Sequence, residues 1–505
     1  MTFGFKRHTN CNRCANIYDM KRKGYLLILT AVLLVAVSCK KYKHEEFGND
    51  MAKAFKSKKY KDFDTTAYFA VFKEQLKAES ENIKNPKWLK KIYSSEDKGL
   101  TLIGHFLVTG EIDSLNWYLQ ASRYHGLNPE YFKANEIAGL LEAVKNTKWK
   151  KVEDSYPSLA KLELYCADGL INYSNILKYG AVNPKKLYGR YYVAVKRPDM
   201  IESQKALEQI DMMKFLESVQ PKNGYYKRLQ NVLINKQRIS AEEREKVYLT
   251  MERLRWPAKS YPAKYLLVNI PEMKLRLIEN NTSDLEMKVC VGETANEGFS
   301  KSGKNHETPI LSGTIDRMQV NPVWNIPKSI AGNEILVSLR KNSAYLDENN
   351  MVAYNKAGEV VNPYDVNWGS ASAEDYAFKQ NPGADNSLGR IKFIFQNPYA
   401  IYLHDTPAQA MFGQSNRAVS HGCVRVEKPM VLASFLLDNE KEAARIKKET
   451  SSAEAQSRWV MIKKPVPVFI AYYTAWAKDN GELISAPDVY GYDAKLKPVF
   501  AKYMF

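Results

Sequence analysis

The sequence changes its pattern near Trp256-Pro257, and this change limits the folds that the chain can adopt. From about Asp50 to Ile239, glycine and proline are rare and apolar residues recur every three or four positions, which is typical of amphipathic helices. Beyond Pro257, short apolar runs alternate with turn residues, as in strands joined by hairpins. The sequence therefore predicts an α+β protein, with a helical part first and a β-rich part second.

Within the β-rich part, two groups of strands are expected, and one of them ends on a histidine. The predicted strands are Tyr265–Ile270, Lys274–Ile278, Leu285–Val291, Arg390–Phe395 and Ala400–His404. Alternation along the last strand puts Tyr402 and His404 on one face and Asp405 on the other. A short helix opened by proline is expected at Pro429–Leu437.

The N-terminal residues have the pattern of a secretory signal. A basic segment from Met20 precedes thirteen apolar residues, Tyr25–Val37, which are too few to span a bilayer comfortably. Ser38-Cys39 then resembles the end of a bacterial lipobox, in which Cys39 would be lipidated, although Ala36 departs from the usual leucine. We therefore expect residues 1–38 to be a signal region. The alternative is an uncleaved anchor.

Two features of residues 1–19 and of the overall charge bear on this interpretation. Met20 is the better start, so residues 1–19 indicate a misassigned start codon, and Cys11 and Cys14 are not expected to bind metal. The net charge of the chain is +18. An exported basic protein meets anionic lipid and wall polymers, so nucleic acid is not the expected partner.

Cysteine and histidine are scarce, and they meet in one place. The chain has 6 Cys and 7 His, and Ser420-His421-Gly422-Cys423-Val424-Arg425 follows His404 closely. Cys166 and Cys290 lie in apolar runs and are expected to be small buried residues. Because a thiolate needs a nearby base or cation, this pattern indicates that Cys423 is a nucleophile.

Each neighbour of Cys423 has an expected role. His404 is the predicted proton acceptor, and the backbone N–H groups of Gly422 and Cys423 are the predicted oxyanion donors. Ser420 and His421 are expected to belong to the loop, with the His421 ring shaping it. Arg425 could bind a substrate carboxylate through its planar fork or brace the loop.

Other interpretations of these residues were considered. His404 could be an ordinary strand histidine, and His404, His421 and Cys423 are all competent zinc ligands. A fourth zinc ligand with sensible spacing is missing, so neither a metal nor a cofactor is expected. The polar segment Ile330–Leu388 could be a lid, a binding insertion or a passive surface excursion.

The residues around Cys423 resemble the active-site signature of bacterial L,D-transpeptidases, in particular the large periplasmic subgroup. The resemblance covers roughly Tyr265–Asp493, with a weaker match to the subgroup's helical scaffold domain upstream. It rests on Ser420–Arg425 with His404, and on Val268–Pro271, Glu307–Pro309, Asn321–Pro327, Pro382–Gly389, Tyr402–Pro407, Pro465–Pro467 and Tyr472–Trp476.

The resemblance implies a β-rich catalytic domain that acts on peptidoglycan stem peptides, with Cys423 as nucleophile and His404 as proton acceptor and donor. It implies that carbapenems acylate Cys423 and that donor and acceptor stems are joined by 3–3 crosslinks. Ile330–Leu388 would be the lid, and Trp324 and Tyr402 match positions that line the cleft. Hydrolysis of stem peptides, or a catalytically silent wall-binding scaffold, are the alternatives.

These expectations define the predicted organisation and location. The chain is divided into a signal region (1–38), a helical scaffold (39–260) and a catalytic domain (261–505) with its lid (330–388). The small peptidoglycan-binding module that the subgroup often carries within its scaffold is missing from residues 229–253. The expected location is the periplasm of a Gram-negative-type bacterium, tethered to the inner or outer membrane through Cys39.

Overall fold

The computed structural model describes residues 44–505 except 95–98, 236–237, 258, 260, 281, 297 and 300–304. The predicted signal region, Cys11, Cys14 and the lipidation site Cys39 lie outside the described residues. No helix in the described part of the chain is long and apolar enough to cross a membrane.

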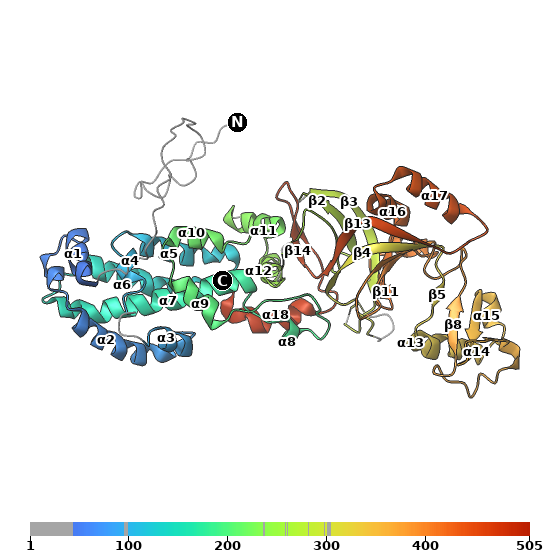
Figure 1. Cartoon of the computed structure of the whole chain (residues 1–505), viewed down its shortest axis with the longest axis horizontal. Coiled ribbons are helices and arrows are strands. Elements are labelled where there is room, and N and C mark those ends of the chain that lie inside the picture. The colour runs from blue at the N-terminus through green and yellow to red at the C-terminus, as the bar shows by residue number, and fades with distance from the viewer. Residues whose placement is uncertain are drawn as a thin grey trace. The chain divides into compact units, whose positions relative to one another are not determined.

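The first part of the chain is helical, as its periodicity predicted, and it is built around α7 (Figure 1). This 24-residue helix is buried along most of its length and contacts α2, α5, α6 and α9. It ends at Gly180, whose φ of 73° suits a residue without a side chain. The helices of this part are α1 (His44–Ala54), α2 (Thr65–Ala78), α3 (Pro86–Ile92), α4 (Ile103–Phe106), α5 (Glu111–Gln120), α6 (Ala134–Asn146), α7 (Tyr156–Tyr179), α8 (Pro184–Leu187), α9 (Met200–Leu207), α10 (Met212–Ser218), α11 (Gly224–Ile234) and α12 (Ala241–Arg255).

Beyond α12, the chain forms a sheet that closes on itself. Its strand order is β3-β12-β10-β9-β4-β13-β1-β2, and β2 pairs again with β3, while β11 pairs with the far end of β3. Closure leaves few unpaired edges in the described strands. The strands are β1 (Lys264–Asn269), β2 (Lys274–Glu279), β3 (Thr282–Gly292), β4 (Leu311–Val320), β9 (Ile391–Phe395), β10 (Leu403–His404), β11 (Ala418–Ser420), β12 (Val424–Val426) and β13 (Arg458–Ala471).

The predicted strands are present, but β10 is shorter than the expected Ala400–His404. On β9, Ile391, Phe393 and Phe395 are buried and alternate with half-buried side chains, so the odd-numbered positions fill the barrel core. Leu403 is paired with Phe393 and therefore faces the same core. His404, the next residue, faces the opposite side of the sheet.

Other parts of the barrel domain follow in chain order. The predicted helix after the cysteine loop is α16 (Pro429–Leu437), and it packs against α17 (Glu440–Ser451) and β13. A short hairpin, β14 (Ala475–Ala477) with β15 (Leu483–Ser485), follows β13.

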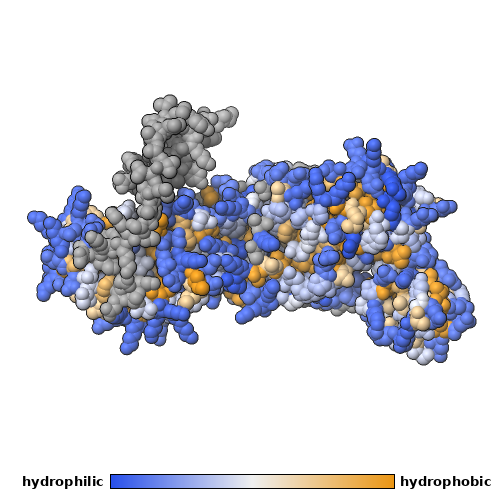
Figure 2. All heavy atoms as spheres, in the orientation of Figure 1, coloured by the Kyte–Doolittle hydropathy of each residue, from blue (hydrophilic) through white to orange (hydrophobic). Residues whose placement is uncertain are grey.

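The segment between β4 and β9 is a separate small substructure with its own core. Its sheet has the order β5-β8-β6-β7, with β5 (Trp324–Asn325), β6 (Met351–Tyr354), β7 (Val360–Val361) and β8 (Ala377–Gln380). Its helices are α13 (Lys328–Ile330), the π-helical turn Ala331–Ile335, α14 (Leu336–Leu339) and α15 (Tyr345–Glu348). We call residues 324–380 the lid segment. On the face drawn in Figure 2, it carries hydrophobic residues among hydrophilic ones.

The C-terminal helix contacts the helical part of the chain. α18 (Tyr492–Phe500), within the segment predicted as the catalytic domain, packs against α12. The reason is a buried ion pair between Arg253 and Asp493, together with stacking of Tyr188 on Tyr492 at 4.5 Å. A buried charge requires a partner, and Asp493 supplies it from the end of the chain.

Candidate active site

Cys423 lies in a tight loop between β11 and β12, and Ser420 holds that loop closed. The Ser420 hydroxyl donates to the carbonyl oxygen of Cys423 at 2.5 Å and accepts from the N–H of Gly422 at 3.1 Å. Thr308 Oγ1 donates to the Gly422 carbonyl at 2.8 Å. Gly422 has φ 110°, a conformation that side chains disfavour, so glycine is required at this turn.

The closed loop changes the expected oxyanion donors. The N–H of Gly422 was predicted to face the substrate, but it already donates to Ser420. The Cys423 N–H has no acceptor among the described residues. Of the two predicted donors, the Cys423 N–H is therefore the group left to stabilise an oxyanion.

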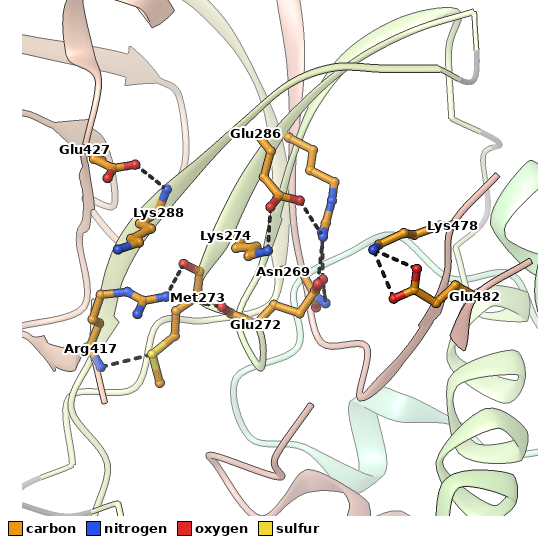
Figure 3. Close-up of polar contacts among 11 residues, drawn as sticks. Asn269, Glu272, Met273, Lys274, Glu286, Lys288, Arg417, Glu427, Lys478 and Glu482 are labelled. Carbon is orange, nitrogen blue, oxygen red and sulfur yellow. Dashed lines mark hydrogen bonds and ion pairs between the residues drawn. The ribbon is translucent and has the colours of Figure 1, made fainter. Parts of the chain in front are cut away.

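Arg417 fixes the strand that leads into this loop. Its side chain is buried, and it donates to the carbonyls of Val289 at 3.1 Å and Met273 at 3.0 Å, while its backbone N–H contacts the Met273 sulfur (Figure 3). Next to it, Glu272 and Glu286 are both bound by Arg276 at 2.6–2.8 Å. The Arg417 contacts tie the start of β11 to β3 and to the turn between β1 and β2, close to the loop that carries Cys423.

His404 is oriented by a backbone carbonyl, not by a carboxylate. Its Nδ1 lies 2.5 Å from the carbonyl oxygen of Asp405. A carbonyl can only accept, so Nδ1 carries the proton and Nε2 has a free lone pair. The Asp405 carboxylate instead accepts from the N–H groups of Arg390 and Thr406, at 2.8 and 2.7 Å. The sequence prediction that this carboxylate does not orient His404 is confirmed.

The surroundings of His404 keep it neutral. It is 5% exposed, and burial lowers its pKa to about 3, with the charges of Arg425 and Lys392 acting in the same direction. His404 is therefore neutral at physiological pH, and its Nε2 lone pair is available to accept a proton.

The Cys423 sulfur is bound by Tyr402. Both the hydroxyl and the backbone N–H of Tyr402 hydrogen-bond to the sulfur, which also lies 3.7 Å from the carbonyl oxygen of Ala400. The indole N–H of Trp324 in turn donates to the Tyr402 hydroxyl. Trp324 and Tyr402, both predicted to line the cleft, are thus joined to the sulfur in one chain of hydrogen bonds.

Cys423 and His404 share the site without a direct hydrogen bond between them in the described structure. Their link is Tyr402, whose ring lies 5.7 Å from that of His404, on the shared face that strand alternation predicted. Burial raises the pKa of the Cys423 thiol, and Tyr402, Lys392 and Arg425 lower it in part. The resting pair is therefore a thiol beside a neutral imidazole, so proton transfer has to accompany attack.

His421 connects the cysteine loop to the lid segment. Its Nε2 lies 2.6 Å from a carboxylate oxygen of Glu334, in the π-helical turn of the lid. Its ring lies 4.8 Å from that of His306, whose Nδ1 contacts Glu293 at 2.9 Å. His421 is thus engaged away from the sulfur, in keeping with the loop-shaping role predicted for it.

Arg425 packs under the turn that follows β10. Its guanidinium lies 3.0 Å from the Met411 sulfur, and its Nε has no hydrogen-bond partner among the described atoms. Cys166 and Cys290 are fully buried, as expected. The described residues hold no group of three His, Cys, Asp or Glu side chains suited to a metal ion.

Sequence reasoning missed Lys392, Glu334 and Thr308. Lys392 stands directly opposite His404 in the β9–β10 register, so pairing the two predicted strands could have found it. Glu334 and Thr308 lie in segments without a periodic signal. Both residues are far from Cys423 along the chain, so local sequence patterns do not predict their contacts with the cysteine loop.

Comparisons with known proteins agree with this site. A family described as the L,D-transpeptidase catalytic domain matches residues 263–467, and one described as a scaffold domain matches residues 87–233. A curated Haemophilus influenzae protein named "Putative L,D-transpeptidase" is 33% identical over 296 residues, which are 58% of this chain and 57% of that protein. The match thus spans little more than half of that relative's length.

Among solved structures, an L,D-transpeptidase from Mycobacterium smegmatis shares 11% identity and covers 42% of this chain and 60% of its own, with a TM-score of 0.19. That score is too low to bear on the fold. The two matched domains lie in the helical part and the barrel described above. The chain thus contains a region similar to a scaffold domain, followed by a region similar to an L,D-transpeptidase catalytic domain.

Proposed function

We propose that this protein is a cysteine-dependent L,D-transpeptidase that forms 3–3 crosslinks between peptidoglycan stem peptides. The observation that carries the proposal is the grouping of Cys423, Tyr402 and His404 on one face of the barrel, with the Nε2 lone pair of His404 free. This arrangement supplies a nucleophile, a hydrogen-bond donor to its sulfur and a proton acceptor.

In the first step, Cys423 Sγ attacks the carbonyl carbon of the third, diamino-acid residue of a tetrapeptide donor. The thiol proton passes to His404 Nε2, and the Cys423 N–H stabilises the oxyanion of the tetrahedral intermediate. The intermediate collapses by breaking the C–N bond to D-alanine. His404 returns its proton to the leaving amine, which leaves a neutral imidazole and a thioester on Cys423.

In the second step, the side-chain amine of another stem attacks the thioester carbonyl. His404, neutral again, accepts the proton of this amine as the C–N bond forms. The C–S bond then breaks, and the proton on His404 returns to the Cys423 sulfur. The products are a 3–3 crosslink and the starting enzyme.

The location follows as part of the same proposal. Peptidoglycan lies outside the cytoplasm, so the enzyme has to be exported. The basic and apolar segments before Cys39 would direct that export, and lipidation of Cys39 would tether the enzyme to the inner or outer membrane on the periplasmic side. The net positive charge would favour contact with anionic wall polymers.

Intact-protein mass spectrometry with a carbapenem tests the nucleophile. Residues 44–505 form one compact unit, so a chain that begins at residue 40 is used beside its Cys423→Ala variant. The proposal expects one drug-sized adduct on the wild type and none on Cys423→Ala. A folded wild type without an adduct would favour the silent scaffold.

Product analysis with a tetrapeptide donor then tests the reaction. Release of D-alanine together with a crosslinked dimer supports transpeptidation. Release of D-alanine with tripeptide as the end product would instead make the protein an L,D-carboxypeptidase that uses the same Cys423. Incubating the enzyme with crosslinked muropeptides alone distinguishes this carboxypeptidase activity from cleavage of existing crosslinks.

A further inference from the structure

Three strands align a row of polar side chains beside the nucleophile. In the register of the sheet, His404 on β10 stands opposite Lys392 on β9 and opposite Arg425 on β12. Their inward neighbours Leu403, Phe393 and Val424 are buried in the barrel core. The histidine is therefore flanked on both sides by a cation, and all three side chains lie on the face that carries the site.

Neither cation is neutralised by a carboxylate in the described part of the chain. Arg425 contacts the neutral sulfur of Met411, and no ion pair is formed by Lys392. Two carboxylates of this region have other partners, because Asp405 accepts backbone N–H groups and Glu334 binds His421. Half-buried cations without a counter-charge favour a negative charge placed near them.

Lys392 contacts the ring of Tyr402, the residue that binds the nucleophile. Its Nζ lies 3.8 Å from the centroid of the Tyr402 ring, and the Tyr402 hydroxyl hydrogen-bonds to the Cys423 sulfur. A cation over the face of a phenol withdraws electron density from the ring and makes its O–H a stronger donor. The sulfur therefore receives both the field of Lys392 and a strengthened hydrogen bond.

We propose that Lys392 is a positioning residue for the nucleophile: with Arg425 and through Tyr402, it stabilises the negative charge that develops on the Cys423 sulfur when its proton leaves. This inference deepens the proposed function, on which it rests for the reaction, but the thiolate itself is measured without any stem peptide. In this arrangement the imidazole is not needed as a permanent cation. It remains free to accept protons in both steps.

Other titratable groups near Cys423 define what a pH measurement reads. Lys392 lies on β9, His404 on β10 and Arg425 on β12. Tyr402 directly precedes β10. His421 faces Glu334 of the lid and His306, which contacts Glu293. Burial lowers the pKa of Lys392, and the nearby Cys423 opposes that change. His404 stays neutral above its pKa of about 3, and the thiolate is the form of cysteine that is alkylated, so the pH dependence of alkylation reports on Cys423.

The test is the pH dependence of alkylation of residues 40–505 by iodoacetamide, a neutral electrophile without a carboxylate. Cys166 and Cys290 are fully buried, so Cys423 is the thiol that reacts in the folded protein. Lys392→Met is expected to raise the apparent pKa of Cys423 by about one unit and to slow alkylation at pH 7 about tenfold. Lys392→Arg keeps the charge and should restore the wild-type profile.

Two further variants make the result specific. Lys379→Met removes a matched cation that lies 4.5 Å over the ring of Tyr354 in the lid segment, and it should leave the alkylation profile unchanged. Tyr402→Phe keeps the ring but removes the hydroxyl, and it should also raise the pKa of Cys423. If Lys392 acts through Tyr402, adding Lys392→Met to Tyr402→Phe raises that pKa by less than the sum of the two single changes.

The outcomes separate this inference from the alternatives. An unchanged pH profile in folded Lys392→Met, checked by circular dichroism, would overturn it. If that variant also bound carbapenem more weakly, Lys392 would be a site for the drug's carboxylate. If Lys392→Met shifts the alkylation profile but the wild-type protein fails to crosslink stem peptides, the role of Lys392 is retained and the proposed reaction is rejected.

Discussion

The barrel and the lid segment meet at the same site but are built in different ways. In the barrel, the residues around Cys423 belong to strands that pair continuously from β3 around to β2, and backbone hydrogen bonds fix their register. The lid segment folds around its own core, which includes Leu346, Trp368 and Phe378. It reaches the site through side chains, Trp324 on Tyr402 and Glu334 on His421.

This difference assigns different roles to the two regions. A closed sheet holds reacting groups in place at little cost in conformational entropy, as the reaction requires. A segment with a separate core and few side-chain contacts to the site can change its position without unfolding the barrel. We therefore propose that the barrel supplies the chemistry and that the lid segment controls access to it.

The largest expected effect is on the acylation rate, and it compares a barrel residue with a lid residue. His404→Gln removes the proton acceptor and should slow acylation by a carbapenem about 10²–10⁴-fold. The matched change in the lid, Trp324→Phe, removes one hydrogen bond to Tyr402 and should slow it less than about tenfold. Stopped-flow or mass-spectrometric acylation rates measure both. Equal losses in the two variants would contradict the division of roles.

A second pair of substitutions compares the two cores. Phe393 in the barrel and Phe378 in the lid are both almost fully buried. Phe393→Ala should cost about 3–5 kcal/mol of barrel stability and lower the main melting temperature. Phe378→Ala should loosen the lid alone, leaving that melting temperature nearly unchanged while reducing turnover of stem peptides. A single shared loss of stability would show that the two cores unfold together.

Acid should destabilise the barrel and the helical part through one buried histidine each. Burial lowers the pKa of both His404 and His125 from 6.5 to about 3. The unfolded chain then binds protons below pH 6.5 that the folded chain does not, so stability is lost as pH falls from 6.5 towards 3. The expected slope is about 1.4 kcal/mol per pH unit for each histidine.

Urea denaturation at several pH values measures this slope. His125→Gln should make the dependence shallower between pH 6.5 and 4, and His404→Gln should do the same. The lid segment contains no histidine, so its local unfolding should lack this acid response. A slope that both variants leave unchanged would mean that other groups control the acid sensitivity.

The smallest expected effect concerns the contact between lid and loop. Glu334→Gln removes the charge that faces His421 and should weaken this contact by about 0.5–1 kcal/mol, because both side chains are partly exposed. Carbapenem acylation should become a few-fold faster if release of the lid limits access. Val337→Ala, which alters an exposed lid residue away from this contact, serves as the control.

Much of the fold could be predicted from the sequence because local patterns carry it. The change from helical to alternating periodicity at Trp256-Pro257 matches the step from α12 to β1, and α16 begins and ends where Pro429–Leu437 predicted. The contact of the C-terminal helix with α12 has no such local signal, because the Arg253–Asp493 pair joins residues 240 positions apart.

The sequence by itself determined which residues are chemically exceptional: the Ser420–Arg425 motif, the histidine at the end of its neighbouring strand, and the glycine that its turn requires. These depend on residue type and short spacing, which the sequence displays directly. Only the tertiary structure decided that the Gly422 N–H is occupied, that a carbonyl orients His404, and that Lys392 and Glu334 reach the site. Strand register and loop closure bring these groups together, and both arise from contacts between residues far apart in the chain.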